Sequence, residues 1–145
     1  MPVARVMVVG GHSAVADVIR IHLHTQRPEI HVEFSLSPAS ALDCITRGFS
    51  GVVVADVGMA PISGMALLRE ARRPRPNLPI VIMMGPFRYG LAIEALNAGA
   101  YAILSKPLKR EECIAVLEAA FRANRLARTV DADRIRLHRC MRRVH

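Results

Sequence analysis

The stretch that decides the fold is Gly51-Val52-Val53-Val54-Ala55-Asp56-Val57-Gly58. A short apolar run, rich in β-branched residues and closed by turn-forming residues, is typical of a strand buried on both faces of a parallel sheet. Asp56 would then stand at the carboxyl end of that strand, where open α/β sheets bind their ligands. The structural alternative is a capping or turn aspartate, since aspartate is common at strand ends. Asp56 is therefore the first candidate for a functional side chain.

Short apolar stretches alternate with amphipathic ones along the first 121 residues. Strands are expected at 3–9, 30–36, 52–56, 80–84 and 101–104, and helices at 13–27, 38–47, 63–72, 88–97 and from about 109 onward. Five such alternations with short loops predict a doubly wound α/β domain whose parallel sheet has helices on both faces. Right-handed crossovers favour the flavodoxin-like strand order 2-1-3-4-5. The predicted organisation is one domain over residues 1–121 and an appended segment over 122–145.

Composition excludes several classes of protein. No apolar run is long enough to cross a bilayer, and the N-terminus lacks the features of a signal peptide, so we expect a cytoplasmic protein without membrane contact. The three cysteines, at 44, 113 and 140, show no metal-ligand spacing and are expected to be reduced thiols. The six histidines form no metal-binding or catalytic pattern. We therefore predict a protein that is not an enzyme and has no metal site.

The positive charge is concentrated at the C-terminus. Residues 1–121 carry a net charge of +2, whereas residues 122–145 carry +6 and are expected to extend the fifth helix and form a short last helix. This basic tail contains Arg122, Arg125, Arg128, Arg134, Arg136, Arg139, Arg142 and Arg143. It could neutralise nucleic-acid phosphates, but it is too short for a helix-turn-helix domain and has no aromatic residue to stack on a base. Docking on an acidic partner or a second subunit is the favoured interpretation, and nucleic acid is the less favoured one.

A series of motifs resembles the receiver domain of two-component response regulators, over about residues 3–122. The motifs are Val54-Ala55-Asp56, Gly64 with Met65-Ala66-Leu67-Leu68, Ala95-Leu96-Asn97-Ala98-Gly99-Ala100, and Leu104-Ser105-Lys106-Pro107-Leu108. The last is the most specific, because a Lys-Pro pair after the fifth strand recurs in that family. The resemblance implies that Asp56 corresponds to the phosphate-accepting aspartate and Lys106 to the lysine paired with it.

The chain also departs from the receiver pattern at several positions. The family normally places two acidic residues after the first strand, where this chain has Gly10-Gly11-His12. Met84 replaces the threonine or serine at the end of the fourth strand, and we expect its thioether in the mouth of the site. Ile103 replaces an aromatic residue of the fifth strand. His12 is a poor substitute for a carboxylate, since imidazole prefers softer metals than magnesium.

These losses bear on phosphoryl transfer, which needs a cation to neutralise the transferred oxygens. Magnesium is held by oxygen ligands, whereas Asp56 and Lys106 alone form a neutral pair that requires no metal. The favoured hypothesis is a pseudo-receiver in phosphorelay signalling, which acts by protein contact and binds magnesium weakly or not at all. One alternative is a receiver still phosphorylated at Asp56 by a partner histidine kinase. Another is an anion pocket at Gly10-Gly11, beside the start of a helix.

The resemblance also implies where partners bind. Receiver domains make regulatory contacts through the fourth helix, fifth strand and fifth helix. The corresponding residues here are Arg88, Tyr89, Tyr101, Arg110 and Glu111. The expected partner is a histidine kinase, an effector, another regulator, or a second copy of the chain bound through this surface or the tail.

Overall fold

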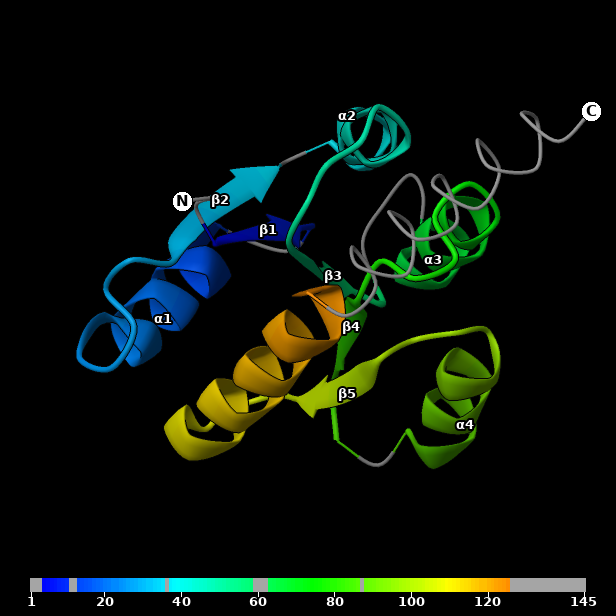
Figure 1. The fold of residues 1–145 in the computed structure, drawn as a ribbon. Helices are drawn as coiled ribbons and strands as arrows, with labels where there is room; N and C mark the ends of the chain where they lie inside the picture. The colour runs from blue at the N-terminus through cyan, green and yellow to red at the C-terminus, as the bar shows by residue number, and fades with distance from the viewer. Residues whose placement is uncertain (1–3, 11–12, 36, 59–62, 87, 126–145) are drawn as a thin grey trace, which may run out of the picture.

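The computed structural model describes residues 4–10, 13–35, 37–58, 63–86 and 88–125, and these ranges form a layered α/β structure (Figure 1). The strands are β1 (Arg5–Val9), β2 (His31–Ser35), β3 (Val52–Asp56), β4 (Ile80–Met84) and β5 (Ala102–Ser105). They form one parallel sheet in the order β2-β1-β3-β4-β5. The flavodoxin-like topology predicted from the sequence is confirmed.

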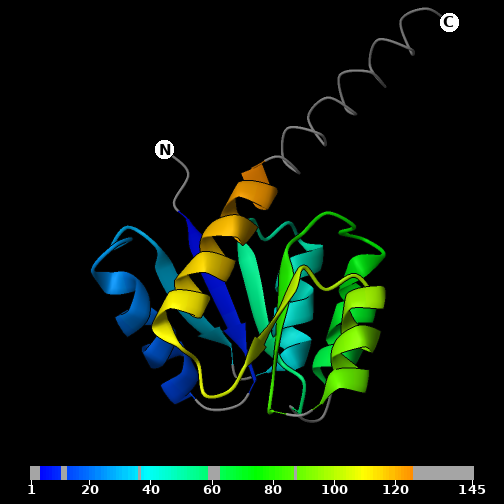
Figure 2. The same cartoon turned by 90° about the horizontal axis from the view of Figure 1, so that it is seen from below.

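Helices cover both faces of the sheet. They are α1 (Ser13–His24), α2 (Pro38–Thr46), α3 (Gly64–Arg72) and α4 (Tyr89–Asn97), followed by a fifth helix over residues 110–125. Figure 2 shows α1 and the fifth helix on one face, and α2, α3 and α4 on the other. Each face has its own apolar core, and β3 contributes to both because all five of its residues are buried. This double burial explains the uninterrupted apolar run before Asp56.

Local signals in the sequence set the helix ends. The Ser37 hydroxyl accepts a hydrogen bond from the Ser40 N–H at 3.2 Å, and Ser63 accepts one from Ala66 at 3.1 Å, so each serine caps the helix that follows. After α4 the chain turns at Gly99, whose φ of +104° is readily adopted only by glycine. The Ser63 cap starts α3 close to the end of β3, where Asp56 lies.

The chain past residue 121 continues the fifth helix without interruption as far as Arg125. Arg122 and Arg125 therefore belong to that helix. The other six arginines of the basic tail, and the last helix predicted there, lie outside the described residues. None of the described helices is both long and apolar enough to span a membrane.

Candidate functional site

Asp56 is the last residue of β3, at the carboxyl edge of the sheet and between β1 and β4. Its side chain is only 8% exposed. The Gly58 N–H donates a hydrogen bond to Oδ1 at 2.9 Å, and the Lys106 Nζ donates one to Oδ2. Both carboxylate oxygens therefore have a partner within the domain.

Lys106 reaches Asp56 from the opposite side of β4. It follows β5 directly, and its backbone N–H donates to the Met84 carbonyl at 2.9 Å, which extends the pairing of β4 with β5 by one residue. The peptide bond to Pro107 is cis. The lysine side chain is 40% exposed, so its ammonium remains in contact with water while it pairs with the nearly buried carboxylate. The two side chains that the sequence singled out are thus brought together as an ion pair.

The start of α3 fixes the backbone beneath this pair. A Cβ built on Gly64 would lie 2.5 Å from the Asp56 carbonyl oxygen, so only a glycine permits this close approach. The Gly64 N–H donates to the Val57 carbonyl at 3.3 Å. The Ser63 cap and Gly64 together hold the end of β3 against the first turn of α3.

Asp56 at the end of β3 and Gly10 at the end of β1 are the described residues that bear on a metal site at this edge. Gly10 follows β1 with a φ of +79° and contributes no side chain. The residues that the structure describes contain no group of three histidine, cysteine, aspartate or glutamate side chains able to hold a metal. Magnesium is bound through carboxylate and other oxygens. The Asp56 carboxylate already accepts from Lys106 and Gly58.

Two further expectations concern Gly10 and its neighbours. The Gly10 N–H donates to the Ser35 carbonyl at 3.3 Å and is therefore not free to bind an anion. Gly11 and His12 lie outside the described residues, so the rest of the proposed anion pocket is not described.

Met84 and Ile103 both face the core covered by α2, α3 and α4. Met84 is 2% exposed and packs within that core, and the partly buried Ile103 packs against it. The expectation that the Met84 thioether stands in the mouth of the site is wrong, because the apolar side chain is withdrawn into the apolar layer. Because Met84 ends β4, this strand end supplies no hydroxyl group to the site.

The five residues expected to form a partner surface do not form a single patch. Tyr89 opens α4 and is 72% exposed, with Arg88 exposed just before it. Arg110 instead lies against the end of α1, where its Nη2 donates to the Thr25 hydroxyl at 2.7 Å, and Glu111 follows it on the fifth helix. Tyr101 precedes β5, at the amino edge of the sheet.

Sequence reasoning missed two residues of the α4 surface. Ile93 and Leu96 are 60% and 49% exposed, and together with Tyr89 they make an apolar stripe, which we call the α4 stripe. The signal was present as spacing, because residues 89, 93 and 96 follow the i, i+4, i+7 pattern of one helix face. That pattern usually marks the buried side of a helix, but in α4 only Ala95 is fully buried.

Comparison with known proteins identifies the class. The model of the response regulator receiver domain matches residues 6–118, and the chain belongs to this family. Among curated relatives, the C4-dicarboxylate transport transcriptional regulatory protein DctD of Pseudomonas aeruginosa is 34% identical over 114 residues, which cover 72% of this chain and 24% of DctD. The transcriptional regulatory protein FixJ of Bradyrhizobium diazoefficiens is 36% identical over 81 residues, 56% of this chain and 40% of FixJ.

Solved structures agree with this assignment. A response regulator receiver domain protein from Clostridium thermocellum superposes with a TM-score of 0.74 at 26% identity, over 85% of this chain and 98% of that one. Full-length FixJ from B. japonicum superposes with a TM-score of 0.76 at 27% identity, over 91% of this chain and 64% of FixJ. The chain thus spans about a quarter of DctD and less than half of the curated FixJ sequence, and the part it matches is a receiver domain of two-component response regulators.

Proposed function

We propose that this receiver domain transmits its signal through protein contacts and that phosphorylation of Asp56 by the usual magnesium-dependent route is impaired. The observation that carries the proposal is the ion pair at the carboxyl edge. Both oxygens of Asp56 are occupied by Lys106 and by the Gly58 N–H, while Gly10 contributes no carboxylate beside them. Because the charges of Asp56 and Lys106 cancel, this pair does not require a divalent cation.

Access and charge support the same conclusion. The Asp56 carboxylate, which would be the nucleophile in phosphoryl transfer, is nearly buried, so a phosphodonor would have to displace the lysine or approach past it. The phosphorylated side chain would carry a charge of about −1.5 to −2 and three terminal acceptor oxygens. Lys106 is the cation placed to meet that charge among the described side chains. The transferred oxygens would therefore be less well neutralised than phosphoryl transfer requires.

Intact-mass spectrometry after incubation with acetyl phosphate and magnesium tests this proposal. The expected result is no phosphorylated species, with Asp56→Asn as the matched negative control. The double variant Gly10→Asp, Gly11→Asp restores two carboxylates; aspartate is among the residues that best tolerate the positive φ at position 10. A gain of phosphorylation in that variant would support the proposal. A phosphorylated wild-type chain, absent in Asp56→Asn, would overturn it.

A second candidate function is phosphorylation of Asp56 by a partner histidine kinase that supplies the missing groups. The observation in its favour is that Asp56 and Lys106 are brought together at the functional edge, although they are fifty residues apart in the chain. The same mass measurement separates the two candidates when a phosphorylated histidine kinase replaces acetyl phosphate. Transfer from the kinase alone would favour the second candidate.

The α4 stripe is the surface we propose for partner binding. Tyr89, Ile93 and Leu96 expose large apolar side chains in one row, and burial of such a row stabilises association by about 25 cal/mol per Å². A histidine kinase, an effector, another regulator or a second copy of the chain would use it. Ile93→Lys should abolish association measured by analytical ultracentrifugation, whereas Ile21→Lys should not, although Ile21 on α1 is even more exposed than Ile93, at 71% against 60%. Loss in both variants or in neither would exclude the stripe.

A further inference from the structure

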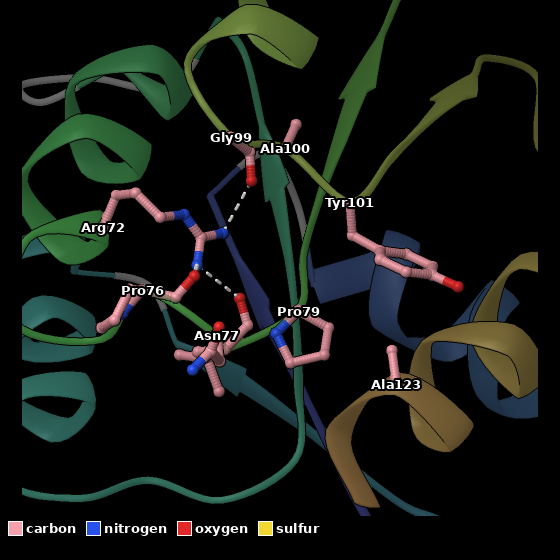
Figure 3. A pocket seen from close by; sticks show the side chains of 9 residues that line it. Arg72, Pro76, Asn77, Pro79, Gly99, Ala100, Tyr101 and Ala123 are labelled. Atoms are coloured by element: carbon pink, nitrogen blue, oxygen red, sulfur yellow. Dashed lines mark hydrogen bonds between the residues drawn. The ribbon is translucent and has the colours of Figure 1, made fainter. Parts of the chain in front are cut away.

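A hollow of about 260 Å³ lies at the amino edge of the sheet, opposite Asp56 (Figure 3). It is formed by the end of α3, the connections that enter β4 and β5, and the fifth helix. Arg72 lines one side of it, and Tyr101, Pro79 and Ala123 line the other. The volume falls below the range of about 300–1,000 Å³ that is usual for drug-sized ligands, so a ligand that fills this hollow is small.

The Arg72 guanidinium keeps one N–H group for a ligand. Its Nη1 donates to the carbonyls of Arg75, Pro76 and Leu78 at 2.9–3.0 Å, and its Nη2 donates to the Gly99 carbonyl at 2.8 Å (Figure 3). Its Nε is buried without a hydrogen-bond partner, packed so closely on Gly99 that a Cβ there would lie 2.9 Å away. A guanidinium carries five N–H groups, two of them on Nη2. Among the described residues, the second N–H of Nη2 therefore has no acceptor.

The charge of Arg72 is not balanced by a carboxylate of the described chain. The nine residues that line the hollow include no aspartate or glutamate. Burial lowers the pKa of the Arg72 guanidinium, whereas hydrogen bonds to Glu33 and Glu29 raise the pKa of Arg5 and Arg27. Arginine nevertheless stays protonated at neutral pH in proteins. A carboxylate brought by a ligand would supply the negative charge that this cation lacks.

The wall that faces Arg72 is apolar. It carries the rings of Tyr101 and Pro79 and the methyl groups of Ala100 and Ala123. Tyr101 is 40% exposed, so its ring is available to a ligand at the rim. Aromatic rings pair favourably in offset or edge-to-face arrangements. The hollow therefore combines a cation on one side with a flat apolar surface on the other.

We propose that this hollow binds a small aromatic carboxylate. The carboxylate accepts a hydrogen bond from Nη2 of Arg72, and the ring of the ligand lies against Tyr101 and Pro79. Hydrogen bonds between ionised partners are about twice as strong as those between neutral groups. An inorganic anion would use the charge but leave the apolar wall bare, and a neutral aromatic compound would use the wall but not the charge.

A titration of the isotope-labelled full chain with benzoate, followed by NMR spectroscopy, tests the proposal. We expect saturable shifts of the backbone amides of Asn77 and Gly99 and of the Ala123 methyl group, all with one dissociation constant. Benzamide has the same shape without the charge, and acetate has the charge without the ring. Each should bind at least about tenfold more weakly than benzoate. Added sodium chloride should weaken the binding of benzoate and leave that of benzamide unchanged.

Variants of the lining separate binding from folding. Arg72 also holds two turns, so the change is made instead at exposed Asn77. Asn77→Asp places a carboxylate in the lining and should weaken benzoate about tenfold without affecting benzamide. Arg73→Gln, which lowers the net charge equally at an exposed position outside the lining, is the matched control and should leave the affinity for benzoate unchanged. Tyr101→Ala should weaken both ligands, and its backbone N–H still pairs with the Ile80 carbonyl.

Several outcomes would overturn the proposal. They are equal affinities for benzoate and benzamide, full benzoate affinity in Asn77→Asp or in a folded Tyr101→Ala, and an absence of saturation. Shifts that map around Lys106 instead of the hollow would also overturn it. The result does not depend on whether Asp56 is phosphorylated, because the two sites lie at opposite edges of the sheet.

Discussion

Removal of Lys106 should destabilise the domain more than removal of Asp56, although both changes break the same ion pair. In Lys106→Met the Asp56 carboxylate, 8% exposed, keeps only the Gly58 N–H as a partner. In Asp56→Asn the ammonium of Lys106, on a side chain that is already 40% exposed, is released to water. The two costs differ because the nearly buried Asp56 carboxylate relies on Lys106 to stabilise its charge, whereas the Lys106 ammonium is also hydrated.

The magnitudes follow from these exposures. An uncompensated charge left in a buried pair costs about 3–5 kcal/mol. The partial hydration of Lys106 and the remaining Gly58 hydrogen bond reduce this to about 2 kcal/mol for Lys106→Met. Asp56→Asn keeps an acceptor for Gly58 and loses one hydrogen bond, which costs about 0.5–1 kcal/mol. In the Asp56→Asn background, the further change Lys106→Met should cost less than about 0.5 kcal/mol.

Urea unfolding followed by circular dichroism at pH 7 measures all four chains of this double-mutant cycle. If the slope of the unfolding free energy against urea concentration is the same in all four chains, the substitutions have changed only stability. If Lys106→Met proves no more destabilising than Asp56→Asn, the carboxylate is hydrated in solution. Asp56 would then not depend on Lys106 for its stabilisation, and the main support for impaired phosphorylation would be lost.

Three further predictions concern positions where the packing is tight. Gly99→Ala should lower the free energy of unfolding by about 1–3 kcal/mol in urea titration, because its φ is +104° and the new Cβ would meet the Arg72 side chain at 2.9 Å. Gly64→Ala should cost a similar amount by displacing the backbone of Asp56, and should shift the Asp56 backbone amide resonance in NMR spectra. Burial raises the pKa of Cys113 to about 11, so its thiol should resist Ellman's reagent at pH 8 until the protein unfolds. Since the unfolded thiol ionises near pH 9, stability should fall between about pH 9 and 11 and show no such fall in Cys113→Ala.

The fold was predictable from the sequence because local and long-range signals agree. The run from Val52 to Asp56 is apolar on both faces, and in the structure β3 occupies the centre of the sheet. The alternation of exposed and buried residues in β2 correctly indicated an edge strand. The helix starts predicted at residues 38 and 63 lie within one residue of the observed ones, where Ser37 and Ser63 cap the helices.

The candidate site was predictable in part. Parallel strands deliver their carboxyl ends to one edge, so the meeting of Asp56 with Lys106 followed from topology. The direction of the Met84 side chain did not, since a strand residue at a sheet edge can turn toward the ligand or into the core, and here the core takes it. The exposure of the α4 stripe also could not be foreseen, because the spacing of an apolar helix face is the same whether the face is buried or open.

The hollow of about 260 Å³ at the amino edge of the sheet (Figure 3) could not be predicted from the sequence for a different reason. Arg72, Gly99 and Ala123 come from three separate parts of the chain, and no local pattern in any of them indicates a ligand. Arg72 and Gly99 are joined because the guanidinium needs acceptors, which the turns before β4 and β5 supply with their carbonyls. The consequence is a division of charge across the domain. At the carboxyl edge Lys106 is paired with the Asp56 carboxylate, whereas at the amino edge the Arg72 guanidinium is held by backbone carbonyls, which are neutral groups.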